Sequence, residues 1–270
     1  MYYAFGKNNL IAASKRRSYP LNMLPMEQFR KFKNEITRFL MDYKFALDAF
    51  ETKIEILKEE FQFFHDYNPI EHTKSRLKSP ESILKKVYKK GCDLSLEGIR
   101  THIKDIAGMR ITCSFISDIY RISEMLRSQS DLKILEIKDY IKNPKPNGYQ
   151  SLHLIIEIPI YMSDRHENVC IEVQIRTIAM DFWASLEHKI YYKYNQAVPA
   201  HLLQELKEAS ESAAALDRQM ERLHKEISEI KESRMEEEAE EAMRRISLSN
   251  QQFQIPEALL RLVSGVDKDS

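Results

Sequence analysis

Three segments in the middle of the chain alternate apolar and polar residues with a period of two. This pattern predicts β-strands with one face against a core and the other against a polar environment. The segments are residues 109–115, 151–158 and 169–176. The polar faces form either an ordinary solvated surface or the lining of a cleft, and alternation alone leaves both interpretations open.

The third segment carries the densest set of chemical groups. Its odd-numbered residues are apolar, whereas Glu172, Gln174 and Arg176 share the opposite face. In the same way, Arg110 of the first segment and His153 of the second lie opposite their apolar neighbours. Such strands are able to cover a core with one face and to line a polar cleft with the other.

Helical periodicity occupies both ends of the chain. Apolar residues at helical spacing from Met26 to about Tyr67 predict one or two long amphipathic helices, which the Asn-Pro pair at 68–69 ends. From Leu203 to Ile230 the apolar residues step by three and four, which predicts a helix that packs on a partner helix within or between chains. Residues 1–25 show no period and predict a loose arm.

Shorter elements are predicted between these ends. Ser79-Pro80-Glu81 marks the start of a helix that runs to Lys90 and ends at Gly91. The other predicted elements are a helix at 118–129, a strand at 132–138, a loop at 142–148 and a helix that Thr177 caps and that reaches about Tyr192. The acidic run 236–241 and the residues after it predict an exposed, partly disordered tail.

Composition excludes several classes of protein. Hydrophobic residues make up 43% and charged residues 30%, with a formal net charge of zero, so the whole chain has no attraction to nucleic acid or membrane. No apolar run approaches the roughly 20 residues that span a bilayer. Cys92, Cys113 and Cys170 lack metal-binding spacing, and the last two lie in strand-like runs where burial is expected. We expect a cytoplasmic protein without structural zinc.

Charge is unevenly placed along the chain. Residues 71–110 hold ten Lys/Arg against five Asp/Glu, and residues 196–270 hold ten against sixteen. A basic middle favours either a bound anion or a solvated basic helix face, and charge alone does not separate the two.

Candidate ligands for phosphate and metal lie near the predicted strands. Asp105 and Glu172 are candidate Mg²⁺ ligands, because this ion is held by one or two carboxylates together with substrate phosphates; ordinary surface charge is the alternative. Arg76 and Lys78 precede the first short helix and Lys86 lies on it, an arrangement that suits an anion. The chain has no GxxxxGK[ST] and no GxGxxG motif, which argues against common NTPase and dinucleotide sites.

The loop before the second alternating segment contains Lys145, Asn147 and Tyr149. The tyrosine either stacks on a nucleotide base or packs against its own strand, and both interpretations stay open.

Five motifs in one order make the chain similar to a known family. It resembles the synthetase domain of the RelA/SpoT family of (p)ppGpp synthetases over about residues 68–195. In its short length the chain resembles the single-domain small alarmone synthetases, and among them most of all the RelP type. The motifs lie at residues 76–78, 105–110, 139–153, 172–177 and 183–188.

The resemblance implies an α+β fold. It predicts a nucleotidyltransferase-like core, a mixed β-sheet flanked by helices, with helical N- and C-terminal extensions. The expected parts are an N-terminal arm and helices at 1–67, the core at 68–195, and a helical segment with an acidic tail at 196–270. The resemblance also implies a homotetramer formed through the helical ends.

The resemblance further assigns roles on the ATP side. Asp105 and Glu172 match the magnesium-binding acids, and Glu172 also matches the proposed base. Arg76 and Arg110 match the arginines that sandwich adenine. Lys78 and Lys86 match the lysines that contact the ATP phosphates.

On the acceptor side, Tyr149 matches the tyrosine that stacks on guanine. His153 and Gln174 match acceptor-side and catalytic contacts, and Lys145 and Asn147 lie in the acceptor loop. The implied catalytic set is Glu172, Asp105, Gln174 and Arg110.

The implied reaction is attack of the 3′ hydroxyl of GDP or GTP on the β-phosphorus of ATP, with AMP leaving, as in the bacterial stringent response. Mg²⁺ is the expected cofactor. The preferred acceptor, any regulating ligand, and the choice between base and metal ligand for Glu172 are not determined by the sequence.

The sequence supports other activities less well than it supports synthesis. The hydrolase domain of long family members uses a His-Asp pair with an upstream histidine; His65-Asp66 is present without one, so no hydrolase activity is expected. The alternatives are a catalytically inactive nucleotide- or RNA-binding module and a helical oligomerisation protein with an incidental sheet. The matches to Asp105, Glu172 and Arg110 argue against the first, and only the helical ends favour the second.

Overall fold

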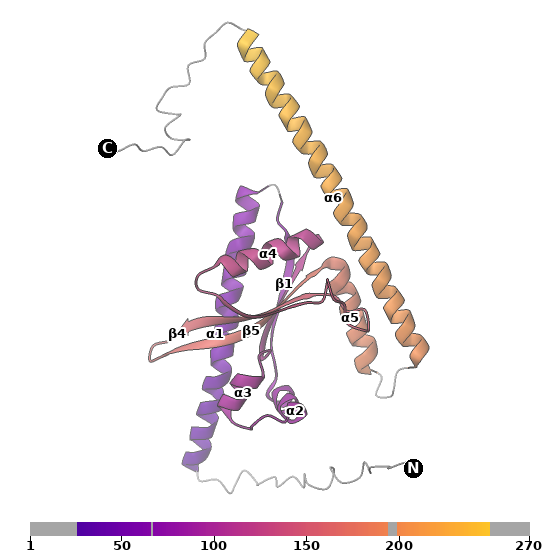
Figure 1. Cartoon of the computed structure of the whole chain (residues 1–270). Coiled ribbons are helices and arrows are strands. Elements are labelled where there is room, and N and C mark those ends of the chain that lie inside the picture. The colour runs from indigo at the N-terminus through magenta and orange to yellow at the C-terminus, as the bar shows by residue number, and fades with distance from the viewer. Residues whose placement is uncertain (1–25, 66, 194–198, 249–270) are drawn as a thin grey trace, which may run out of the picture.

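A computed structural model describes residues 26–65, 67–193 and 199–248 (Figure 1). The predicted arm at 1–25, Asp66 and the end of the tail lie outside these residues. Its helices are α1 (Met26–Phe64), α2 (Pro80–Lys90), α3 (Leu96–His102), α4 (Ile116–Ser128), α5 (Ile178–Lys193) and α6 (Ala200–Leu248). Its strands are β1 (Ile70–Leu77), β2 (Ala107–Cys113), β3 (Lys133–Asp139), β4 (Leu152–Tyr161) and β5 (His166–Thr177).

The five strands form one mixed sheet in the order β1-β2-β5-β4-β3. Only the central pair β2 and β5 is parallel, and the other three pairs are antiparallel. The α+β class with helices around a mixed sheet is therefore confirmed, as are the three alternating strands. β1 and α3 are additional elements that the periodicity did not predict.

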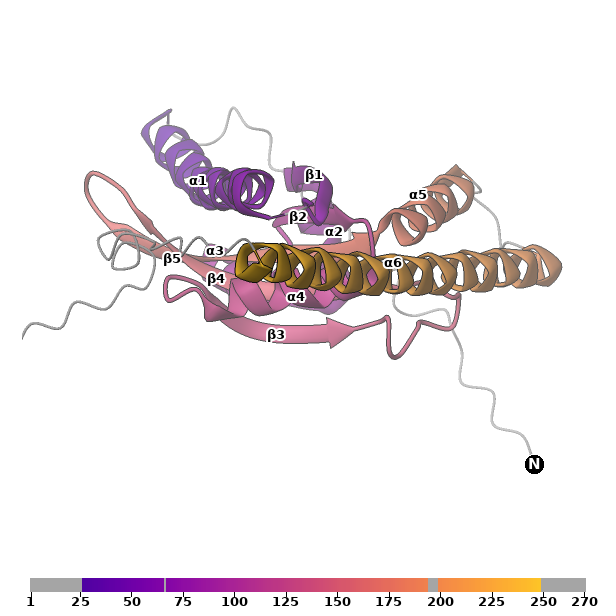
Figure 2. The same cartoon turned by 90° about the horizontal axis from the view of Figure 1, so that it is seen from above.

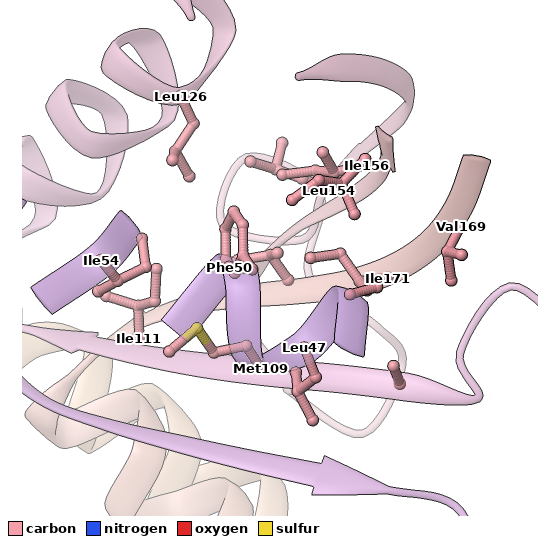
Figure 3. Packing of buried hydrophobic residues seen from close by; sticks show 14 of the residues in the cluster. Leu47, Phe50, Ile54, Met109, Ile111, Leu126, Leu154, Ile156, Val169 and Ile171 are labelled. Carbon is pink, nitrogen blue, oxygen red and sulfur yellow. The ribbon is translucent and has the colours of Figure 1, made fainter. Parts of the chain in front are cut away.

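The apolar face of the sheet packs against α1 and α4, as Figure 3 shows. Ile54 of α1 lies beside Ile111 of β2, and Phe50 of α1 and Leu126 of α4 point into the same buried cluster. Full burial of each such side chain stabilises the fold by about 1.5–3 kcal/mol. Since this face is closed by helices, the polar groups of the central strands are left on the opposite face.

Helix boundaries follow local signals. Ser79 accepts a hydrogen bond from the Ser82 amide at the start of α2, and Gly91 ends the helix in the left-handed conformation with φ 65°. The α1 helix is continuous over 39 residues, which settles the choice between one helix and two. Cys113 and Cys170 are buried, as expected.

The α6 helix runs for 49 residues and lies across α4 and α5 before extending past the core (Figures 1 and 2). The acidic run 236–241 lies inside this helix and not in a disordered tail. Its residues are mostly Glu and Ala, which are good helix formers, so the helix continues through them. None of the described helices has both the length and the hydropathy needed to cross a membrane.

Candidate active site

The register of the sheet brings the predicted polar residues into rows on one face. Gln174 of β5 lies directly opposite Arg110 of β2 and His153 of β4. One row further along, Glu172 lies opposite Gly108, which in turn lies opposite Arg76 of β1. Residues directly opposite each other in a sheet point to the same side, so strand pairing alone gathers these groups.

A cavity of about 210 Å³ opens where these rows meet. Arg76 and Arg110 border it from β1 and β2, and Glu172 and Gln174 border it from β5. Because Gly108 lies between the two arginines and has no side chain, it leaves space above the sheet. The structure thus brings together four of the residues that the sequence selected.

Five side chains form a closed ring of polar contacts beside this cavity. Arg176 Nη2 donates to Tyr149 Oη at 2.5 Å and to Gln174 Oε1 at 2.7 Å. Gln174 Nε2 donates to Glu172 Oε2 at 2.9 Å, and His153 Nδ1 lies 3.5 Å from Glu172 Oε1. His153 Nε2 and Tyr149 Oη, 2.7 Å apart, close the ring. The pattern is satisfied when the tyrosine donates to Nε2 and the histidine proton is on Nδ1.

The ring sets the ionisation of Glu172. Burial acts to raise its pKa, but the contacts of the carboxylate with His153 and with the amide of Gln174 outweigh burial and lower the pKa below its usual value. Glu172 is therefore a carboxylate at neutral pH, able to accept a proton or to bind a cation.

Asp105 lies between two lysines at the end of the loop before β2. Lys78 Nζ donates to Asp105 Oδ2 at 2.6 Å, and Lys86 Nζ of α2 donates to the same oxygen. Burial acts to raise the pKa of Asp105, but the two lysines together lower it. The charge of Asp105 also acts on Glu172, so the two acids share one electrostatic environment.

Magnesium fits this pair of acids. Asp105 Oδ1 is buried and has no hydrogen-bond partner within the described structure, so it is open to a cation. The described residues contain no group of three or more acidic, histidine or cysteine side chains that could hold a metal ion. Mg²⁺ prefers one or two carboxylates plus substrate phosphates, and Asp105 with Glu172 supplies that set.

The acceptor loop brings only part of its predicted residues to the ring. Lys145 Nζ lies 4.6 Å from the centre of the Tyr149 ring and 4.5 Å from that of Tyr140. Asn147 instead donates to Glu187 of α5 at 3.3 Å and accepts from the Tyr149 amide at 3.2 Å. Its role in this structure is to shape the loop.

Sequence reasoning missed two site residues. Alternation puts Arg176 on the polar face and gives it no role, yet Arg176 is only 3% exposed and joins Tyr149 to Gln174 in the ring. Asp181 of α5 lies 2.9 Å from Arg110 Nη1 and 3.1 Å from Arg176 Nη1. The signal that was available is Thr177, which caps α5 by accepting from the Met180 amide and so places Asp181 in its first turn.

His65 of the His65-Asp66 pair is exposed just after the end of α1 and does not line the cavity, and Asp66 lies outside the described residues.

Comparison with known proteins agrees with the geometry. Residues 75–197 match the model described as the region found in RelA / SpoT proteins. The chain is 54% identical to GTP pyrophosphokinase YwaC of Bacillus subtilis over 207 residues, covering 77% of this chain and 99% of the relative. It is 37% identical to GTP pyrophosphokinase YjbM of the same organism over 192 residues, covering 71% and 90%.

Solved structures give the same assignment. The crystal structure of small alarmone synthetase 2 from Bacillus subtilis is 57% identical, with a TM-score of 0.65, and covers 72% of this chain and 98% of that one. Small alarmone synthetase 1 from the same organism, bound to its product pppGpp, is 36% identical with a TM-score of 0.67 and the same coverage. The chain therefore belongs to the RelA/SpoT family and, within it, to the small alarmone synthetases.

Proposed function

We propose that this protein is a GTP pyrophosphokinase that transfers the β,γ-pyrophosphate of ATP to the 3′ hydroxyl of GDP or GTP and releases AMP. The relatives YwaC and YjbM carry that name, and small alarmone synthetase 1 from Bacillus subtilis is bound to pppGpp in one solved structure and to AMPCPP in another. The observation that carries the proposal is the polar ring around an ionised Glu172 at the edge of the arginine-lined cavity.

On the ATP side, Arg76 and Arg110 hold the adenine between their guanidinium planes in the cavity. Lys78 and Lys86, which now pair with Asp105, contact the phosphates. Two cations at one carboxylate leave positive charge for a polyphosphate, so these lysines stabilise the charge that develops during transfer.

On the acceptor side, Tyr149 stacks on guanine, with Lys145 and Asn147 in the same loop and His153 and Gln174 beneath it. Tyr149 is joined to His153 and Arg176 by hydrogen bonds, so its ring is held in one orientation. A fixed stacking surface positions the 3′ hydroxyl for attack, and positioning is a large part of the rate gain in group transfer.

The chemistry centres on Glu172. As a carboxylate it accepts the proton of the 3′ hydroxyl while the oxygen attacks the β-phosphorus and the bond to AMP breaks. The contacts of Gln174 and His153 hold the carboxylate in place. Mg²⁺ held by Asp105 and Glu172 would neutralise phosphate charge and polarise the phosphoryl centre.

Two observations support an active enzyme over a nucleotide- or RNA-binding module that has lost catalysis. Both candidate acids have lowered pKa values, and three of the four predicted catalytic residues, Glu172, Gln174 and Arg110, border one cavity. We infer a cytoplasmic enzyme, since its three cysteines are free and its substrates are free nucleotides.

We also infer a homotetramer built through the helical ends. Apolar side chains repeat along exposed faces of α5 and α6, which is a pattern typical of helices that bind other helices. The exposed residues are Ile178, Phe182, Leu186 and Ile190 on α5, and Leu216, Met220, Leu223, Ile227 and Ile230 on α6.

The activity is tested by incubating the protein with ATP, Mg²⁺ and either GDP or GTP and separating the nucleotides by chromatography. We expect guanosine tetra- or pentaphosphate in the complete mixture and none with excess EDTA or with Glu172→Gln. Complete mixtures that yield neither product with the folded wild type would overturn the proposal. Comparison of the two acceptors also gives the substrate preference.

A further inference from the structure

One carboxylate oxygen lies between two arginines of the site. Asp181 Oδ1 is 2.9 Å from Arg110 Nη1 and 3.1 Å from Arg176 Nη1. The Asp181 side chain is 18% exposed, so water screens these contacts only in part. Both arginines therefore share a single anchoring atom.

The two arginines would repel each other without this carboxylate. They come from neighbouring parallel strands, where Arg110 lies opposite Gln174 and Arg176 follows two residues later on the same face. Burial and the charge of Arg176 lower the pKa of Arg110, and the charge of Asp181 opposes that change. Arg176 is 3% exposed, and a cation buried to that degree requires a carboxylate partner.

The two arginines face different substrates. Arg110 borders the cavity with Arg76 on the ATP side. Arg176 donates to the hydroxyl of Tyr149 and to Gln174 on the acceptor side. A chain of contacts thus runs from the ATP cavity through Asp181 to the tyrosine of the acceptor loop.

The position of Asp181 is itself fixed by α5. Thr177 caps this helix, and the hydroxyl of Thr177 also donates to Asp217 of α6 at 2.6 Å. Trp183, two residues after Asp181, donates through Nε1 to the carbonyl of Leu206 at 2.8 Å. The first turn of α5 is therefore anchored on both sides of Asp181.

We propose that Asp181 is a positioning residue that aligns the ATP side and the acceptor side of the site together, by holding Arg110 and Arg176 in one geometry. It acts through the two arginines and does not itself contact the reacting atoms. The inference rests on the proposed pyrophosphate transfer and adds a residue to it.

The test measures the KM for ATP, the KM for the acceptor and kcat in Asp181→Asn, which keeps the shape and removes the charge. Loss of a charge-assisted anchor for both arginines should raise each KM by about tenfold. Asp181→Glu, which keeps the carboxylate, should recover part of both losses. Circular dichroism and thermal unfolding confirm that each variant is folded.

Asp42→Asn is the matched control. Asp42 also pairs with two arginines, Arg100 and Arg165, and it contacts none of the ring residues. It should lower thermal stability and leave both KM values within about twofold of the wild type. Asp181→Ser provides a second neutral variant if Asn at position 181 prevents folding.

The outcomes separate the two proposals. An inactive wild type would overturn the proposed function. An active wild type with unchanged KM values in the folded neutral variant would overturn the role of Asp181 alone. A rise in only one KM would also contradict it, because the shared oxygen would then serve only one arginine.

Discussion

At the scale of single residues, the site depends on groups that fix one another. Each member of the ring contacts two neighbours, and Arg176 provides the link between Tyr149 and Gln174. Such a network is stronger than its separate contacts suggest, because removal of one member leaves a buried donor or acceptor without a partner.

The ionisation of Glu172 predicts a pH dependence of stability. Its pKa in the fold lies below the usual 4.5, so its carboxylate stabilises the folded state above pH 4.5 and loses that contribution as pH falls through the folded pKa. We expect the Tm difference between wild type and Glu172→Gln to be constant from about pH 8 to about pH 5.5 and to shift against the wild type in more acidic buffer. Thermal unfolding of both proteins across this range measures it. A difference that stays constant down to about pH 3 would contradict the lowered pKa.

The hydroxyl of Tyr149 predicts a second effect. Tyr149→Phe keeps the stacking ring but leaves Arg176 and His153 each without one partner, which should lower kcat/KM by about tenfold. Tyr140→Phe is the comparison, since Tyr140 contacts Tyr149 and His153 through its ring, and its effect should be smaller. Steady-state assays measure both, and equal losses would show that the hydroxyl contacts of Tyr149 are unimportant.

Alternation predicted part of this site. It placed Glu172, Gln174 and Arg176 on one face, because side-chain direction in a strand follows from position alone. It could not predict Asp181, whose contacts depend on how α5 leaves the sheet. Residue type alone made Asp105, Lys78 and Lys86 candidates, with surface charge as the alternative. The resemblance selected between the two, since no local pattern marks residues that meet only after folding.

At the scale of elements, the sequence predicts the helices and strands that bury one face and expose the other, because their apolar residues then repeat regularly. β1 was missed because it is an edge strand in which Ile70 alone is buried, so its sequence does not alternate clearly. The seven-residue α3 is too short to show a helical period. The long α1 and α6 were predicted because their apolar residues repeat over many turns.

The α6 helix also holds the acceptor loop. Ser210 Oγ donates to the carbonyl of Gly148 at 2.5 Å, immediately before Tyr149. Gly148 has φ 89°, and a Cβ on it would lie 2.6 Å from Cβ of Ser210. Only glycine allows this backbone conformation and this close approach, so the helix and the loop fit together as one unit.

This contact gives a prediction for the acceptor. Ser210→Ala removes the hydrogen bond with little change in volume, so it should raise the KM for GDP or GTP by about threefold to tenfold and change the KM for ATP less. Ser212→Ala is the control, because Ser212 is exposed and bonds only within α6, to the carbonyl of Glu208. Equal acceptor KM values in the two variants would contradict a role for α6 in holding the loop.

At the scale of the whole molecule, one side of α6 packs on the core. Another side of the helix carries an exposed apolar seam formed by Leu223, Ile227 and Ile230. Figure 1 shows the helix continuing well past the sheet. In the described monomer, Leu223, Ile227 and Ile230 are exposed on this part of α6. Exposed apolar side chains at this spacing favour association with further helices.

Oligomer formation is tested by replacing Leu223, Ile227 and Ile230 together with lysine. Positive charge on the seam should prevent association of the chains and so lower the mass measured by light scattering. The contacts of Ser210 and Asp217 with the core should remain. Replacing the exposed Glu226 and Glu229 with lysine is the control for added charge. An unchanged mass in the triple variant would exclude the seam as an interface. This test is sharper than deletion of residues 203–232, which would also remove the contact of Ser210 with Gly148.

The most direct test of the central claim follows the β-phosphorus of ATP. The protein is incubated with Mg²⁺, GDP or GTP, and ATP labelled at the β-phosphorus, and the products are separated. The account predicts label in the guanosine product, one AMP released per product formed, and neither with Glu172→Gln. Label that stays in ADP while the acceptor remains unlabelled would contradict pyrophosphate transfer by this site.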